Sequence, residues 1–200
     1  MAQRSGLGAA PHGLVLVQSL INTSIIKRAG DPDADRLSGL PVARAWLGEA
    51  LAAWATATGR PAPPITLGEH DLVPLRELRE TLRTSLRAEA PNAPGEFPPI
   101  PAVRPEAAVR LTIEPGGVRY DPAGTGVQAV TGLVAVELLL AQATGAAGRL
   151  KTCASPTCGV AFYDASPNRA RVWHDTKVCG FPANLRASRF RKAAGPENRR

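Results

Sequence analysis

The sequence lacks any long uninterrupted run of apolar residues. Its most apolar stretch, Val127 to Ala143, is broken by polar residues at positions 128, 131, 137 and 142, whereas a membrane-spanning helix needs about 18 apolar residues in a row. Near the N-terminus only Leu14 to Val17 are consecutive large apolar residues, which is too few for the core of a signal peptide. We therefore expect a soluble, cytoplasmic protein with no membrane partner.

Excess charge of either sign is also missing from the first 148 residues, which hold 13 basic and 14 acidic residues. Residues 149–200 differ, because they hold 11 basic residues against three acidic ones. A basic segment attached to a near-neutral domain is typical of proteins that bind a polyanion such as nucleic acid. The alternative interpretation is a basic tail that is merely solvated.

Hydrophobic periodicity predicts three helices in the first 90 residues. They span Leu14 to Ile25, Pro41 to Thr58 and Leu72 to Leu86, and the first two are followed by Gly30-Asp31-Pro32 and Gly59-Arg60-Pro61. Helices of this kind pack their apolar faces together, so we expect a core formed by large residues on those faces. The expected core residues include Trp46, Trp54, Leu75 and Leu82.

Six prolines between residues 91 and 105 exclude a helix there and predict an extended connector. Apolar and polar residues then alternate on both sides of Glu114-Pro115-Gly116-Gly117, which predicts a β-hairpin over residues 109–121. A helix from Val127 to Ala147, apolar over most of its circumference, is expected to be central to the core. The predicted fold class is therefore α+β, mainly α.

Cysteine is scarce, and all three cysteines lie between residues 153 and 179. Cys153 and Cys158 form a C-x4-C pair, and His174 and Cys179 form an H-x4-C pair after an interval of 15 residues. Two close pairs of soft ligands joined by a short loop suit a tetrahedral zinc ion. Four protein ligands would close the site, so we predict one structural zinc and no catalytic residue.

Alternative interpretations of this cluster remain. A disulfide would leave one of the three thiols unpaired and is disfavoured in the cytoplasm. Independent free thiols would leave the clustering with one of only three histidines unexplained. If His174 were not a ligand, the zinc would keep an open position, as in a metalloenzyme. Because no nucleophile in the chain is accompanied by a recognisable base, the sequence does not favour an enzyme.

Further residues around the cluster carry a resemblance to a known family. They are Phe162-Tyr163-Asp164, Asn168-Arg169, Trp173 and Cys179-Gly180. With the C-x4-C pair they resemble the CGNR zinc-finger family of bacterial transcription regulators. Nearer the N-terminus, Leu20-Ile21-Asn22-Thr23 and the leucines and arginines of residues 75–79 resemble stretches of that family's helical ABATE domain. The resemblance implies a helical domain over 1–148 and a zinc finger over 149–195, and we expect residues 196–200 to be a disordered tail.

The chain departs from the family pattern in two places. His174 stands where the family usually has a cysteine, and imidazole is an ordinary zinc ligand. Phe181-Pro182 stands where the family has Asn-Arg after Cys-Gly, and Asn184 and Arg186 lie further downstream.

The sequence also predicts how the finger would bind DNA. Pro182 suits the first turn of a basic helix that ends near Gly195, and we expect Phe162, Tyr163 and Trp173 to form the small core of the finger. The candidate nucleic-acid-binding residues are Arg169, Arg171, Arg186, Arg189, Arg191 and Lys192.

The leading hypothesis is a DNA-binding transcription regulator whose helical domain senses an unknown small-molecule effector or mediates homodimer formation. The first alternative is a zinc-organised protein-interaction module. The second is a zinc-thiolate redox sensor or metalloenzyme.

Overall fold

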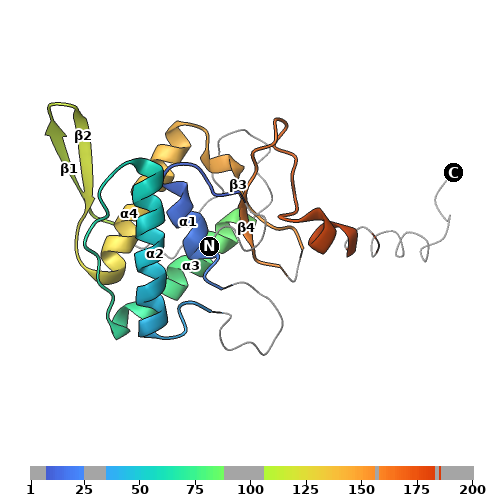
Figure 1. Ribbon diagram of the computed structural model, residues 1–200, viewed down its shortest axis with the longest axis horizontal. Helices are drawn as coiled ribbons and strands as arrows, with labels where there is room; N and C mark the ends of the chain where they lie inside the picture. The colour runs from blue at the N-terminus through green and yellow to red at the C-terminus, as the bar shows by residue number, and fades with distance from the viewer. Residues whose placement is uncertain (1–7, 25–34, 88–105, 156–157, 183–184, 186–200) are drawn as a thin grey trace.

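The computed structural model describes residues 8–24, 35–87, 106–155, 158–182 and 185. It shows a mainly helical protein with two small antiparallel hairpins (Figure 1), as the predicted fold class requires. The helices are α1 (Leu14–Ile21), α2 (Leu40–Thr58), α3 (Leu72–Arg87) and α4 (Gly126–Ala143). The strands are β1 (Val109–Glu114), β2 (Gly117–Pro122), β3 (Leu150–Thr152) and β4 (Ala161–Tyr163). Three short helical turns complete the fold: η3 (Glu69–Asp71), η4 (Ala147–Arg149) and η5 (Thr176–Gly180).

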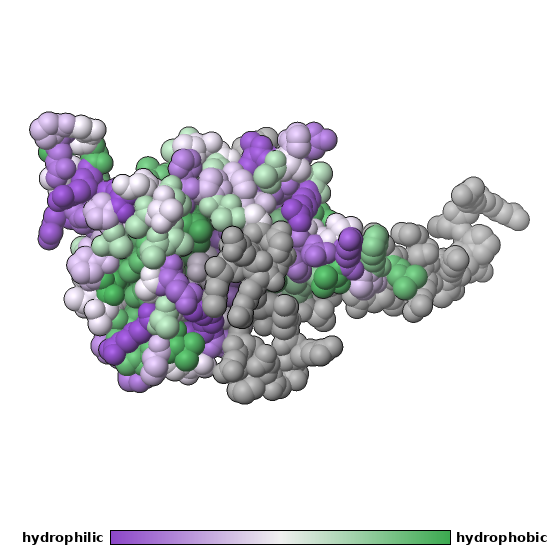
Figure 2. All heavy atoms as spheres, viewed as in Figure 1, coloured by the Kyte–Doolittle hydropathy of each residue, from purple (hydrophilic) through white to green (hydrophobic). Residues whose placement is uncertain are grey.

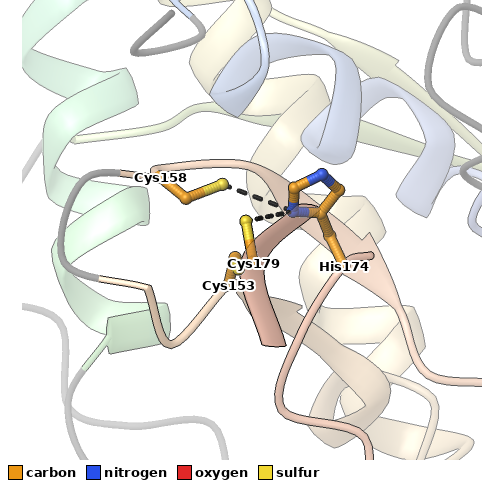
Figure 3. Close-up of side chains that lie close together, drawn as sticks. All are labelled: Cys153, Cys158, His174 and Cys179. Atoms are coloured by element: carbon orange, nitrogen blue, oxygen red, sulfur yellow. Dashed lines mark hydrogen bonds between the residues drawn. The ribbon is translucent and has the colours of Figure 1, made fainter. Parts of the chain in front are cut away.

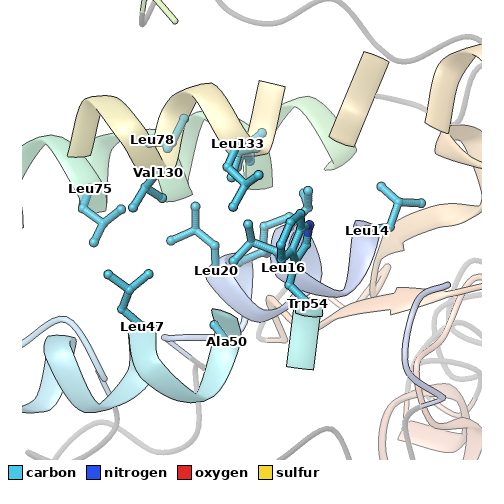
Figure 4. Close-up of a cluster of buried hydrophobic side chains, with 14 of the residues drawn as sticks. Leu14, Leu16, Leu20, Leu47, Ala50, Trp54, Leu75, Leu78, Val130 and Leu133 are labelled. Carbon is cyan, nitrogen blue, oxygen red and sulfur yellow. The ribbon is translucent and has the colours of Figure 1, made fainter. Parts of the chain in front are cut away.

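The four helices surround one apolar core, and α1 contacts each of the other three. Leucines and valines of α1, α3 and α4 meet the apolar face of α2 in this core (Figure 4). The four predicted core residues, Trp46, Trp54, Leu75 and Leu82, are all buried, which confirms the prediction. Because each fully buried large side chain contributes about 1.5–3 kcal/mol, this core is the main source of stability.

The observed helix ends test the boundary predictions. α2 has a proline in its first turn and ends where Gly59 adopts a left-handed conformation with φ of 71°, as the sequence predicts. The prediction that the first helix continues to Ile25 is wrong. The chain turns after Ile21 because the Thr23 N–H bonds the Leu20 carbonyl, and Ser24 then forms a bridge with Asp35.

Buried arginines on α3 fasten it to the chain on either side of residues 25–34. Arg79 Nη1 donates to Asp35 Oδ1 at 2.6 Å, and Arg83 Nη2 donates to the Ile21 carbonyl at 2.7 Å. Hydrogen bonds from a charged donor to buried acceptors contribute more than neutral ones, about 1.5–3 kcal/mol each. The leucine face of α3 is predictable from spacing, whereas these arginine contacts are not.

Asp71 joins the N-termini of α3 and α4. Its buried carboxylate accepts the Gly68 N–H at 2.7 Å and the Val127 N–H at 2.9 Å. Gly126 has a φ of 55°, and a Cβ added there would lie 2.3 Å from both Asp71 carboxylate oxygens. A side chain at position 126 is therefore incompatible with this double cap.

Within the described part of the chain, α4 is the one helix long and apolar enough to cross a membrane by length and composition. It is instead a core helix, since most of its residues are buried against α1, α3 and the first hairpin. Glu137 lies in its buried face, and its Oε1 accepts hydrogen bonds from Trp54 Nε1 and the Tyr120 hydroxyl, both at 2.6 Å. The helix ends at Ala143, so its predicted extension to Ala147 is wrong.

The β1–β2 hairpin is confirmed and has a two-residue turn, with Glu114 opposite Gly117. Its base packs against α4, and its distal half stands clear of the helices (Figure 1). The space-filling view shows this half projecting from the body of the molecule (Figure 2). The connector predicted over residues 91–105 lies outside the described residues.

A second hairpin, β3–β4, is absent from the sequence-based predictions. Its strands have three residues each, which is too short to show an alternating pattern. Leu150 of β3 and Ala161 of β4 belong to the main helical core, whereas Cys153, Cys158 and Val160 belong to a separate small cluster. The hairpin therefore links the helical core to the region of the cysteines.

Candidate metal centre

The C-x4-C pair lies at the open end of the β3–β4 hairpin. Cys153 follows β3 directly, and its N–H bonds the Val160 carbonyl at 2.9 Å, which extends the pairing of the two strands. The Cys158 N–H bonds the Ser155 carbonyl at 3.0 Å and closes a turn. The two thiols lie close enough for one metal ion to bind both (Figure 3).

The H-x4-C pair is positioned by the start of a helical turn. Asp175 caps η5, since its Oδ1 accepts the N–H groups of Lys177 at 2.7 Å and Val178 at 3.0 Å. His174 precedes this cap, and Cys179 lies one turn later, with its N–H bonded to the Asp175 carbonyl at 2.9 Å. The helix thus begins at Thr176, before the predicted start at Pro182, and residues 181–182 continue it.

The structure brings together all four predicted ligands. Their ligand atoms lie within 4.8 Å of one another, and all four residues are buried. His174 Nδ1 is 3.3 Å from Cys158 Sγ and 3.7 Å from Cys179 Sγ (Figure 3). These separations fit a tetrahedron around zinc, whose ligand atoms are about 3.5–3.8 Å apart when its bonds to sulfur and nitrogen are about 2.3 and 2.0 Å long.

The chemistry of the four donors also fits a dication. Burial, with the neighbouring thiols Cys153 and Cys179, raises the pKa of Cys158 to about 12, and burial also raises the pKa of Cys179. Buried thiols with raised pKa values become thiolates only when a cation compensates their charge. The three cysteines are free of disulfides, and His174 supplies the fourth donor. The set matches one structural zinc ion. Its four protein ligands would fill the tetrahedral coordination, so no position stays open for a catalytic water.

A second polar centre holds the loop between β4 and His174. The fully buried carboxylate of Asp164 accepts hydrogen bonds from Lys151 Nζ at 2.7 Å, the Ser166 hydroxyl at 2.6 Å and the Arg171 N–H at 2.9 Å. Burial works against the charge of Asp164, but these donors outweigh it and lower its pKa to about 2. The ionised carboxylate therefore fixes the chain that leads to the third ligand.

The three aromatic residues expected to form the core of the finger separate in the structure. Trp173 packs against the cluster of Cys153, Cys158, Val160 and Cys179, as expected. Phe162 is fully buried, with the guanidinium of Arg171 5.4 Å from its ring centroid. Tyr163 packs against the helical core instead, so the prediction is wrong for this residue. It does so because β4 runs along the boundary between the two clusters.

Two of the six predicted nucleic-acid-binding residues lie within the described part of the chain. Arg171 is exposed, yet its guanidinium donates to the carbonyls of Trp173 and His174 and so also supports the metal centre. Arg169 is half-buried and has a φ of 50°, and its carbonyl accepts from Lys151. The other four, Arg186, Arg189, Arg191 and Lys192, lie outside the described residues.

Comparison with known protein families agrees with this architecture. The ABATE family model, described as "putative stress-induced transcription regulator", matches residues 14–152. The chain belongs to the ABATE family. The model of the CGNR zinc finger matches residues 149–192, which include all four metal-site residues. None of the curated proteins compared with the chain matches it. Both families are regulator or zinc-finger families rather than enzyme families.

Sequence reasoning missed the residue that joins the ABATE helices to the finger. The Asn22 side chain accepts the Ala161 N–H at 2.8 Å and donates to the Ala161 carbonyl at 2.9 Å. Gln18 Nε2 donates to the same carbonyl at 3.3 Å. Asn22 follows α1, so its amide pairs with the outer edge of β4 as another strand would. The resemblance of Leu20-Ile21-Asn22-Thr23 to the family singles out this stretch without indicating its partner.

Proposed function

We propose that this ABATE-family regulator binds DNA through its zinc-finger region. The observation that carries the proposal is the charge distribution: the excess positive charge lies in residues 149–200, on a segment organised by a closed, structural zinc site. Positive side chains on a fixed frame bind DNA phosphates and release condensed counterions. A cytoplasmic location, as expected from the sequence, belongs to the same proposal.

The four metal-site residues hold the finger in shape in this proposal. Cys153 and Cys158 tie the β3–β4 hairpin, and His174 and Cys179 tie the start of the following helix. Zinc supplies only charge compensation and tetrahedral geometry in such a site, because all four positions are taken by protein ligands. The metal site therefore holds the first turn of the helix that begins at η5 in a fixed position.

Apart from Lys177, the basic residues of the finger divide into two groups. Arg149 and Lys151 serve the structure, since Arg149 donates to the Asp164 and Ser166 carbonyls and Lys151 to the Asp164 carboxylate. The six predicted residues, Arg169, Arg171, Arg186, Arg189, Arg191 and Lys192, are the proposed DNA contacts. Arg171 combines both tasks, because its two hydrogen bonds leave donors of the guanidinium available to a phosphate.

The test is the salt dependence of binding to a labelled duplex of about 30 base pairs and mixed sequence. For the zinc-loaded full chain, log affinity is expected to fall with log salt by about 0.9 per phosphate contact. The double variant Arg186→Glu/Arg189→Glu should bind more weakly with a slope lower by about 2, and should keep its zinc.

The matched control is Lys27→Glu/Arg28→Glu, which changes the net charge equally but lies outside the finger. It should leave the slope unchanged. Absence of salt-dependent binding by the zinc-loaded wild type, or equal affinities of the wild type and the Arg186/Arg189 variant, would contradict the proposal.

A protein-interaction module is the second candidate, and one observation favours it. Apolar side chains around η5 are exposed, namely those of Val172, Val178, Phe181 and Leu185. Exposed apolar groups that lie together mark protein-binding surfaces more often than DNA-binding ones. Nuclease-treated protein that still captures a partner, and loses it in the variant Val178→Ser/Phe181→Ser, would support this candidate. A sensing role for the helical domain stays a prediction.

A further inference from the structure

The free edge of β1 carries an unused set of backbone hydrogen-bonding groups. The Ala123 N–H bonds the Ala108 carbonyl at 2.9 Å, which makes 108 and 123 a hydrogen-bonded pair at the base of the hairpin. Bonded and non-bonded pairs alternate along an antiparallel ladder, so residues 110, 112 and 114 also direct their backbone groups to β2. Leu111 and Ile113 therefore direct their N–H and C=O groups to the outer edge, and among the described residues no donor or acceptor meets them there.

The outer edge of β2 is different, because the protein itself covers part of it. Arg60 Nη2 donates to the Tyr120 carbonyl at 3.0 Å, and its guanidinium stacks on the Tyr120 ring at 3.5 Å from the centroid. The bond to Arg60 also confirms the alternation, since it shows the Tyr120 carbonyl pointing away from its partner Leu111. Pro122, at the end of the strand, has no N–H to offer. Among the described residues, no side chain binds the β1 edge in this way, so β1 is the less obstructed edge for another strand.

The hairpin also has an exposed apolar face beyond the helices. Leu111, Ile113 and Val118 share this face, and they are 65%, 88% and 62% exposed. Arg110, Thr112 and Glu114 lie on the opposite face of β1. A two-stranded ribbon with one apolar face is marginal alone and gains stability when further strands widen it. Native edge strands are protected against pairing by prolines, bulges and charged side chains. β1 has no proline, no bulge and no charge on its apolar face, and its two charged residues, Arg110 and Glu114, lie on the opposite face.

We propose that two copies of this chain pair through β1, antiparallel about a two-fold axis at Thr112, into a four-stranded sheet. The charges select the second copy as the partner. In this register Arg110 lies opposite Glu114 of the other copy, so two opposite-charge pairs form around the axis. Leu111 then lies opposite Ile113 of the other copy, with the outward backbone groups of each facing those of the other. The apolar side chains of both hairpins meet on one face of the sheet.

The test measures the dimer dissociation constant of the zinc-loaded full chain by sedimentation velocity over a concentration series. Leu111→Pro removes an outward N–H and none of the N–H groups that bond β2. It should weaken the dimer at least about tenfold, because the two copies lose two hydrogen bonds between their edges and the proline rings hold the strands apart. Leu111→Ala is its matched control, since it keeps the N–H and should retain a measurable dimer. Circular dichroism and zinc content should match the wild type in both variants.

Charge reversal tests the register itself. Arg110→Glu places two acidic residues opposite each other, and Glu114→Arg places two basic ones, so each variant alone should dimerise about tenfold more weakly than the wild type. An equimolar mixture of the two should restore the wild-type affinity, because each mixed pair is again of opposite charge. A monomeric wild type, a dimer indifferent to Leu111→Pro, or no recovery in the mixture would each overturn the proposal. Both reversals lie on exposed positions of the strand. Glu114→Arg also removes the exposed ion pair of Glu114 with Arg119 of its own chain, and pairs of this kind contribute at most about 1 kcal/mol, so the fold tolerates the change.

Discussion

The helical core and the metal centre differ in what they bury. The core draws apolar side chains from four helices and from the β3–β4 hairpin. In the described part of the chain, the apolar cluster of the metal centre consists of three cysteines, Val160 and a half-buried Trp173. So few apolar atoms cannot compensate the conformational entropy lost by some thirty ordered residues. The helical part of this chain is thus stabilised by hydrophobic burial, and the other part by metal–ligand bonds and buried polar contacts.

The two parts nevertheless share the β3–β4 hairpin. Leu150 and Ala161 face the helices, and Cys153 and Val160 face the metal centre. Asn22 adds two hydrogen bonds across this boundary. How far the two regions depend on each other can be measured by removing the contacts of each in turn.

The largest effect is expected from removing zinc. Structural zinc contributes about 10–16 kcal/mol of apparent binding free energy in small fingers, so chelation should unfold residues 153–180 while α2 and α4 keep their protection. Amide hydrogen exchange read by mass spectrometry checks this. Cys158→Ala should act like the chelator, and His174→Cys should retain one zinc per chain. Acid should release zinc, because protons compete for the thiolates and the imidazole. Equal loss of protection in the helices would show that the regions are one cooperative unit.

Leu75→Ala should produce the converse result. Leu75 is fully buried in the helical core, so truncation should lower the free energy of unfolding by about 2–5 kcal/mol. The zinc content measured by mass spectrometry should stay at one per chain. Leu139→Ala on α4 is the matched control, because that side chain is 62% exposed and its loss should change stability by less than about 0.5 kcal/mol. A loss of zinc from folded Leu75→Ala protein would show that the metal centre depends on the packing of the helical core.

Asn22→Ala should weaken the link between the regions. The Ala161 N–H and carbonyl then lose their hydrogen bonds to the Asn22 amide. The free energy of unfolding measured in urea should fall by about 1–3 kcal/mol. Asn22→Asp keeps the acceptor for the Ala161 N–H but turns the second carboxylate oxygen toward the Ala161 carbonyl oxygen, so its cost should be at least as large as that of Asn22→Ala. In Asn22→Ala the shift of the helical melting temperature on chelation should be smaller than in the wild type. An unchanged shift would mean that Leu150 and Ala161 packing alone couples the regions.

Asp164→Asn should have the smallest effect, about 1–2 kcal/mol, on the zinc-loaded protein. The folded-state pKa of Asp164 is lowered to about 2. Its charge therefore contributes fully above the ordinary value near 3.8, and that contribution is lost only as the pH falls toward 2. The difference in unfolding free energy between wild type and variant should thus be constant from pH 6 to 8. A difference that changes across this range would assign the effect to another group.

Much of the architecture was predictable because its signals are local. Helical spacing placed α2, α3 and α4 to within a few residues, turn residues placed the β1–β2 hairpin, and the cysteine and histidine spacing named the four residues that meet at the metal centre. Contacts between residues far apart in the sequence leave no such local signal. The arginines of α3 look like any solvated polar face in the sequence, yet Arg79 and Arg83 are buried. The three-residue strands β3 and β4 are too short for periodicity to indicate.

The apolar faces of the helices, the donor set for zinc and the separation of charge between the two regions follow from the sequence alone, because residue type and spacing are properties of the chain. Which polar groups meet across long separations in the sequence depends on the tertiary structure. Asn22 finds Ala161, Trp54 and Tyr120 find Glu137, and Asp71 caps a helix that begins 55 residues later. Each buried polar group must be satisfied where packing places it, and packing is known only once the whole chain has folded.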